Sequence, residues 1–313
     1  MTRTQSWLAA AALIVVWALL PQGLPRQYVD LLNFAAILAV GGLGVGLLLG
    51  QCGIVNLGQA AFYGCGAYAS AYCTTVLGWP AITGFVVGAA ISALLAALIG
   101  LPILRLSGFF LALATLAVGS IAGALFFEWD WLTGGTLGIG GISKLSLFGF
   151  ALDTPERFYY FVWLFTALLL WLAHNLVEGR PGLSMRAMRD APPAAEVLAI
   201  DMHRLKTKIF VICAVLGSLS GSLFAHYVSF VSVQSFTVER SIMFLLVPVI
   251  AGAHSVGGIV IGALFVALVP ELLSGLGDIH QVLFGLILVL VVTLVPGGLT
   301  GVLTQLRQRR SAR

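Results

Sequence analysis

The stretch EGRPGLSMRAMRDAPPAAEVLAIDMHRLKTK, residues 178–208, holds ten of the 28 formally charged residues of the chain (16 Lys and Arg, 12 Asp and Glu). The sequence on either side is apolar over long runs, relieved mainly by glycine. One charge at the centre of a bilayer costs about 2.5–3.5 kcal/mol on insertion scales, so this segment cannot lie in hydrocarbon. Its excess of basic residues, six against four acidic, is typical of cytoplasmic loops. We therefore predict a cytoplasmic loop around which the rest of the chain forms membrane helices.

The composition excludes a soluble globular protein. Apolar residues make up 60% of the chain, charged residues 9%, and the mean hydropathy is +1.05. We predict an all-α polytopic membrane protein in which residues 1–313 form a single transmembrane domain. The net charge of +4 does not indicate a nucleic-acid partner, because no basic stripe with interleaved aromatic residues occurs. The expected surroundings are membrane lipid.

The apolar runs predict about ten transmembrane helices, since roughly 20 helical residues cross a bilayer core. The runs are residues 6–20, 29–50, 49–72, 81–104, 109–127, 158–177, 209–227, 241–251, 256–269 and 282–302. The number is eight if the two weakest runs only re-enter the membrane. Alternating sides place both termini and residues 178–208 in the cytoplasm, and the more acidic loop 128–157 outside. The basic tail agrees with this orientation through Arg307, Arg309, Arg310 and Arg313.

Residues 49–72, LGQCGIVNLGQAAFYGCGAYASAY, differ from an ordinary lipid-facing helix. They combine amide side chains, including Asn56 and Gln59, with several glycines. An uncharged amide at membrane depth must face protein or water, and glycine lets neighbouring backbones approach closely. Asn56, Gln59 and Tyr63 are therefore candidates for the translocation path. The alternative is that the amides only hold spans together through interhelical hydrogen bonds. A comparable glycine-rich stretch at 250–263 hints at an internal duplication of the kind that transporters use.

The sequence lacks the motifs of an enzyme or of a self-energised pump. No Gly-Lys pair occurs, so there is no phosphate-binding Walker A loop. The five histidines form no HExxH motif, the four cysteines no CxxC motif, and no GxSxG occurs. We expect no metal, no cofactor and no catalytic residue. Carboxylates suited to an ion relay are scarce in the spans, so we expect the energy to come from a partner protein.

Proline positions predict a short helix inside the charged loop. Pro193 cannot lie inside a helix that already includes Arg189, and the residue before a proline is pushed out of the α region. We expect Pro192 to be extended and a helix to run from Pro193 to about Ile200. Ala194, Val197 and Leu198 would form its apolar face. So short a helix needs a partner to become ordered, which favours a docking element over a solvated connector.

Four stretches resemble the permease subunits of branched-chain amino acid ABC importers, with a closer likeness to the LivM type than to its LivH-type companion. They are GLLLGQCGIVNLGQAAFYGCGAYASAY, EWDWLTGGTLGIGGI, the charged loop with the span that follows it, and LVPELLSGLGDIHQVLFGLILVLV. The resemblance extends from about residue 31 to residue 299. This chain departs from the family pattern at Pro192 and Pro193, at Ala199 in place of a glycine, and in AGAHSVGG.

The resemblance implies an ABC importer permease fold with a cytoplasmic coupling helix, in the bacterial inner membrane. The implied partners are a companion LivH-type permease, two ATP-binding ATPase subunits and an extracytoplasmic solute-binding protein. The implied ATPase-coupling residues are Arg189, Asp190, Ala194, Ala195, Glu196, Leu198 and Ile200. The implied function is uptake of branched-chain or related hydrophobic amino acids, driven by ATP hydrolysis in the separate subunits. The alternatives are a self-sufficient facilitator or channel for a small polar solute such as urea and, less favoured, a membrane enzyme.

Overall fold

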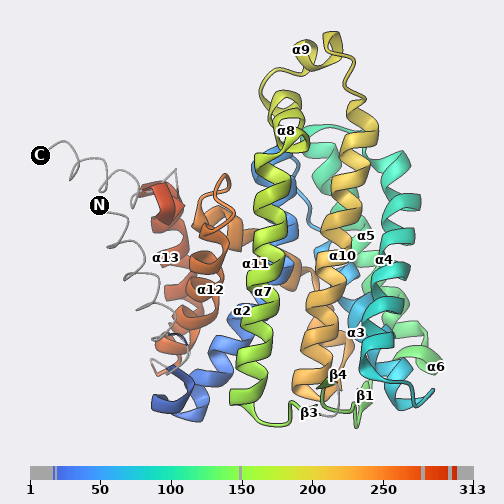
Figure 1. Cartoon of the computed structure of the whole chain (residues 1–313), viewed down its shortest axis with the longest axis vertical. Helices are drawn as coiled ribbons and strands as arrows, with labels where there is room; N and C mark the ends of the chain where they lie inside the picture. Colours follow the sequence, from blue (N-terminus) through green and yellow to red (C-terminus); the bar gives the residue numbers. More distant parts are fainter. Residues whose placement is uncertain (1–16, 18–19, 148–149, 276–278, 295–297, 302–313) are drawn as a thin grey trace, which may run out of the picture.

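The chain forms a helical bundle with very little sheet (Figure 1). The computed structural model describes residues 17, 20–147, 150–275, 279–294 and 298–301. The first part of the described bundle contains α2 (Arg26–Gly46), η1 (Leu47–Gln51), α3 (Gln59–Thr75), α4 (Ala81–Ile103), α5 (Gly108–Glu128), α6 (Asp130–Thr133), β1 (Ile139–Gly140), β2 (Ser146–Leu147) and β3 (Phe150–Ala151). The second part contains α7 (Pro155–Glu178), α8 (Arg180–Asp190), α9 (Pro192–Val197), α10 (Met202–Val228), β4 (Phe230–Val231), η2 (Val233–Phe236), α11 (Val238–Ala251), α12 (Gly258–Ser274) and α13 (His280–Leu294).

Five helices among the described residues are long and apolar enough to cross a membrane: the continuous helix α2–η1, then α4, α5, α7 and α10. This confirms the predicted all-α polytopic class. The predicted runs at 241–251, 256–269 and 282–302 correspond to the shorter helices α11, α12 and α13. The first predicted span, 6–20, and the basic tail lie almost wholly outside the described residues. The count of ten spans therefore stays a prediction.

Helices α2 and α10 form the buried centre of the bundle, whereas fewer than a quarter of the residues in the apolar windows of α4, α5 and α7 are buried. The centre is held by very close backbone approach between α3 and α10. A Cβ atom on Gly221 would lie 1.8 Å from the carbonyl oxygen of Tyr63, and one on Gly66 would lie 2.0 Å from that of Ser218. Larger residues cannot occupy these positions without separating the helices. Glycine at these two positions therefore permits the close packing of α3 against α10.

Two landmarks define the ends of the bundle. The end that carries α8 and α9, at the top of Figure 1, is here called the α9 end. At the opposite end, β1 pairs with β4 in an antiparallel two-stranded sheet, and we call this the sheet end. Helix α2 runs from the sheet end to the α9 end, and α10 runs the other way. Each is followed by a break and a shorter helix, α3 after α2 and α11 after α10.

The two halves of the chain therefore follow the same plan in opposite directions. In the first half, α2, a break, α3, α4 and α5 succeed one another; in the second half, α10, a break, α11, α12 and α13 do so. Helix α10 packs on α3 and α4, and α2 packs correspondingly on α11 and α12. This is the pattern of an inverted repeat, a common architecture of transporters in which broken helices meet near the repeat interface.

Candidate functional site

The first break lies at 52–58, where the backbone leaves the π-helical turn η1 and continues without helical structure into α3. Gly53 has a φ of +68°, which favours glycine at this sharp change of direction. Non-helical backbone at membrane depth is tolerated only where the protein satisfies its polar groups. Here the amide of Leu57 donates to Thr115 Oγ1 (3.0 Å), and the amide of Gly58 donates to Asn56 Oδ1 (2.9 Å).

Two predicted path residues, Asn56 and Gln59, are fully buried and joined in one hydrogen-bond network. Asn56 Nδ2 donates to Gln59 Oε1 (3.2 Å), and the thiol of Cys213 donates to the same oxygen (3.1 Å). Gln59 Nε2 donates to the carbonyl oxygens of Gly41 (3.2 Å) and Cys213 (3.0 Å). The network thus fastens the first break to α2 and α10. This geometry is the interhelical arrangement considered as the alternative for these amides.

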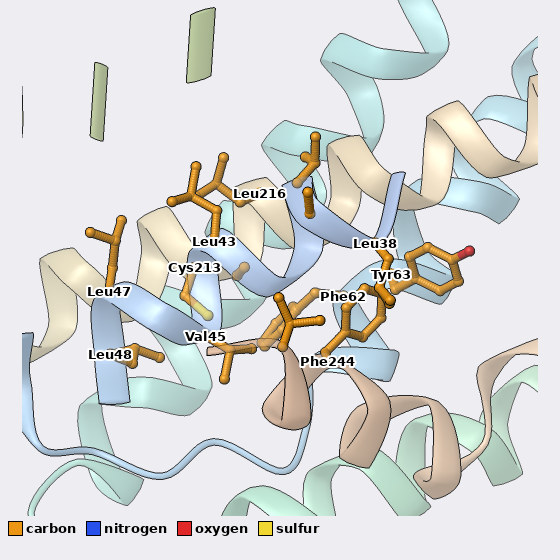
Figure 2. Close-up of a cluster of buried hydrophobic side chains, with 14 of the residues drawn as sticks. Leu38, Leu43, Val45, Leu47, Leu48, Phe62, Tyr63, Cys213, Leu216 and Phe244 are labelled. Atoms are coloured by element: carbon orange, nitrogen blue, oxygen red, sulfur yellow. The ribbon is translucent and has the colours of Figure 1, made fainter. Parts of the chain in front are cut away.

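The third predicted path residue, Tyr63, lies apart from that network. Its ring packs edge-on to Phe236 and Phe244, and it lines a cavity of about 330 Å³ between α2, α3, α10, α11 and α12. Figure 2 shows Leu38, Tyr63 and Phe244 close together, with the hydroxyl of Tyr63 directed away from the cluster. Of the three predicted path residues, Tyr63 is therefore the one that reaches open space.

The second break, residues 229–237, leads into α11 and brings its beginning against α3. Ser229 has a φ of +60°, and the short helix η2 buries Phe236 before α11 begins at Val238. The amide of Ala60, in the first turn of α3, donates to Ser241 Oγ (2.9 Å) in the first turn of α11. The N-termini of the two short helices therefore face one another inside the bundle, as in transporters with broken helices.

Sequence reasoning missed Arg240, which also lines the cavity at Tyr63. Residues 228–240 fall between the two predicted spans 209–227 and 241–251, outside both. In the structure Arg240 belongs to the first turn of α11 and lines the cavity together with Leu38 and Tyr63. The sequence feature that could have indicated this position is that Arg240 directly precedes the apolar run 241–251.

At the α9 end, Arg189 joins α8 to the end of the broken helix α2–η1. Its guanidinium donates to the carbonyl oxygen of Gly50 and, through Nε (2.7 Å) and Nη2 (3.1 Å), to the carboxylate of Asp190. The aliphatic part of Arg189 packs over Gly53, where an added Cβ would lie 2.9 Å from its Cγ. The guanidinium beside Asp190 lowers the pKa of that exposed carboxyl group. Arg189 thus touches both the loop and the first break.

The predicted helix after Arg189 exists, but its predicted limits are wrong. Helix α9 begins at Pro192, not Pro193, and ends at Val197 rather than near Ile200. Pro192 is tolerated because the first turn of a helix needs no donor from its N–H groups. The helix ends early because Ala199 is left-handed, with a φ of +55°. The amide of Ile200 then bonds the carbonyl of Ala195 (3.1 Å), and that of Ala199 the carbonyl of Glu196 (2.9 Å), which is a Schellman motif.

The exposed face of the α8–α9 hairpin includes Val197 and Leu198 of the predicted apolar face but excludes Ala195, one of the implied coupling residues. Val197 and Leu198 are 87% and 71% exposed, and Leu183 on α8 is also exposed. Ala195 is fully buried, so it is not available to a partner. Glu196 is exposed and Ile200 is half-buried, and Ala194 lies within α9. The sequence could not separate these positions, because a two-turn helix has apolar residues on both faces.

Among the described residues, no group of three or more His, Cys, Asp or Glu side chains is placed to hold a metal ion. The arrangement offers a broken-helix interior, an apolar cavity lined by Arg240, and a projecting hairpin tied to the first break. Such an arrangement is suited to moving a solute and to receiving a mechanical input.

A family model described as "Branched-chain amino acid transport system / permease component" matches residues 27–292. The chain is similar to the high-affinity branched-chain amino acid transport system permease protein LivM of Salmonella typhimurium and that of Escherichia coli. Each is 29% identical over 92% of this chain and 73% of the relative. A probable branched-chain amino acid transport permease protein LivM of Methanocaldococcus jannaschii is 27% identical over 70% of this chain and 65% of the relative. No solved structure matches.

Proposed function

The chain belongs to the family of branched-chain amino acid transport system permease components, and from that premise we propose that it forms half of the path by which an ATP-driven importer takes up branched-chain or related hydrophobic amino acids. It is a LivM-type, multi-pass permease subunit of an ABC importer, so its role is transport rather than catalysis. The family relationship does not favour a self-sufficient facilitator or channel.

The observation that carries the proposal is the α8–α9 hairpin. It projects from the bundle, exposes Val197 and Leu198 at its tip, and is tied through Arg189 to the first break. A contact made at the tip can therefore act on the broken helix inside the membrane. The partners that we propose are two ATP-binding ATPase subunits, one of which docks on this hairpin, and a LivH-type companion permease in the membrane. An extracytoplasmic solute-binding protein would dock at the sheet end.

This assignment orients the chain. The α9 end lies in the cytoplasm, where ATP is available, and the sheet end, with 128–157, lies outside, in agreement with the Lys and Arg bias of the loops. The membrane is the bacterial inner membrane, and both termini are cytoplasmic.

The test is reconstitution of this chain with its companion permease, ATPases and solute-binding protein in proteoliposomes. The expected result is uptake of radiolabelled L-leucine or L-valine that needs both ATP and the solute-binding protein. ATP-independent equilibration of the solute by this chain alone would favour a facilitator and contradict the proposal.

A further inference from the structure

The cavity at Tyr63 contains one formally charged side chain in otherwise apolar surroundings. Its volume is about 330 Å³, within the range of about 300–1,000 Å³ typical of small-molecule sites. Most of its wall is aliphatic or aromatic and includes Phe34, Leu38 and Met243. The exceptions among the lining residues are the guanidinium of Arg240 and the phenol of Tyr63.

Arg240 has no anionic partner among the described residues. The three ion pairs found there are Arg157–Asp153, Arg189–Asp190 and Arg204–Asp201. A guanidinium remains charged in any protein environment, and charged groups at membrane depth normally pair or face a water-filled path. Arg240 is half-buried, and Phe244, one turn further along α11, packs on Gly41 in the interior of α2. Its charge therefore calls for an anion that this part of the chain does not supply.

The position of Arg240 on its helix strengthens this requirement. It is in the first turn of α11, where the helix dipole already presents positive charge and disfavours a cation. The first turn of α3 is adjacent, because the amide of Ala60 bonds Ser241 Oγ. Two helix N-termini and a guanidinium thus raise the local potential in one place. An anion bound there would gain from all three.

We propose that Arg240 binds the carboxylate of the transported solute in this cavity. The inference rests on the proposed function and deepens it by naming the residue that binds the carboxylate of the solute and the cavity that holds its apolar side chain. The planar fork of Arg240 matches a carboxylate in a two-bond geometry. The apolar part of the solute lies against Leu38, Met243 and Phe244, which gain contact area without losing hydrogen bonds. A neutral solute such as urea would leave the charge of Arg240 unpaired.

The first experiment measures uptake of radiolabelled L-leucine by the complete importer in proteoliposomes. Arg240→Gln is expected to lower uptake at least tenfold, and Arg240→Lys, which keeps the charge but loses the fork, several-fold. Glu239→Gln is the matched control, since Glu239 is exposed on the same turn and outside the cavity lining. It should stay within twofold of the wild type. Wild-type uptake by an assembled Arg240→Gln importer would overturn the proposal. So would loss of the companion permease from that variant, which would assign Arg240 to a subunit contact.

The second experiment measures binding without transport. Met243→Cys places a thiol in the cavity, and its rate of alkylation in the purified complex is compared with that of the parent chain. L-leucine and isovalerate, which carry a carboxylate, should slow alkylation, whereas isopentylamine should not. Adding Arg240→Gln should remove the protection. Equal alkylation rates with and without both carboxylates would overturn the site. Protection by isovalerate in an importer that fails to transport leucine or valine would uphold the site and contradict the proposed substrates instead.

Discussion

The guanidinium of Arg189 donates a hydrogen bond to the carbonyl oxygen of Gly50, 139 positions earlier in the chain. Gly50 is in the last turn of the α2–η1 helix, where carbonyl groups lack intrahelical partners. One basic residue of the α8–α9 hairpin therefore completes the end of the central helix, directly before the first break. A displacement of α8 would move this carbonyl and Gly53 with it. The contact is a direct structural connection between the hairpin and the broken interior.

Replacing Arg189 should uncouple the importer without separating its subunits. Arg189→Gln removes a charge-assisted hydrogen bond worth about 1.5–3 kcal/mol, and 1.4 kcal/mol is about tenfold in an equilibrium. We expect about tenfold less leucine uptake with normal co-purification of the ATPases. Arg204→Gln is the control, because the Arg204–Asp201 pair is exposed and such pairs contribute little. Unchanged uptake in Arg189→Gln would remove the contact from the coupling route.

The exposed tip of the hairpin should be the surface on which an ATPase docks. Leu198→Asp puts a charge where the proposed contact buries an apolar side chain that is 71% exposed in this chain alone. Burial of a leucine is worth about 1.5–3 kcal/mol, so ATPase co-purification should fall at least tenfold. Leu198→Ala should show a smaller loss, and Glu178→Gln, at an exposed position at the end of α7, little change. Full association of the ATPases with Leu198→Asp would return the loop to the role of a connector.

The sequence indicated a charged segment with a short helix in this part of the chain, but not that α10 begins at Met202 or that Ala195 faces inward. Prolines and apolar residues indicated a short helix, because they act on the local backbone. Burial depends on how α9 packs on α8, which no local pattern encodes. Ala195 was therefore predicted at the partner contact and lies inside the chain. Ala195→Arg would disrupt the hairpin itself, so it cannot test docking.

The sequence indicated that the broken interior has an unusual composition, but not which residues contact one another there. Glycines and amides at 49–72 correctly indicated an unusual span, since both are costly in a lipid-facing helix. Whether Asn56 and Gln59 line a path or bond other helices depends on Gly41 and Cys213, which are distant in sequence. Arg240 was missed because the break before α11 carries it inward from a segment that reads as a surface turn.

Removal of the amide group of Gln59 should lower the stability of the fold and leave transport per folded molecule unchanged. Gln59→Leu leaves the buried carbonyls of Gly41 and Cys213 without this donor, and an unsatisfied buried group costs about 1–3 kcal/mol. The midpoint of thermal inactivation in detergent should fall, and uptake should fall only in proportion to folded protein. Thr293→Val, at an exposed hydroxyl on α13, is the control. A variant with wild-type stability and no uptake would show instead that Gln59 acts on the solute.

The two ends of the bundle should be labelled from opposite sides of the membrane. Ser143 is exposed at the sheet end, where its carbonyl accepts from His226, and Val197 is exposed at the α9 end. A membrane-impermeant thiol reagent should label Ser143→Cys in intact spheroplasts, and Val197→Cys only after permeabilisation. The parent chain, whose cysteines lie within the bundle, gives the background. Labelling of both variants from the same side would contradict the orientation.

Ala199 is the residue at which a single substitution should strengthen the hairpin. Its backbone is left-handed, a conformation that is unfavourable by roughly 1–2 kcal/mol for any residue with a Cβ atom. Glycine avoids this penalty and is the usual residue at this position of a Schellman motif. Ala199→Gly should therefore stabilise the end of α9 by about 1 kcal/mol, or about fivefold in its opening equilibrium. The amide of Ile200, which bonds the carbonyl of Ala195, should exchange its hydrogen about fivefold more slowly.

Ala191→Gly is the matched control: Ala191 has a φ of −148°, so glycine there should leave exchange unchanged or faster. Equal slowing in both variants, or in neither, would show that the conformation of Ala199 does not limit the stability of the hairpin.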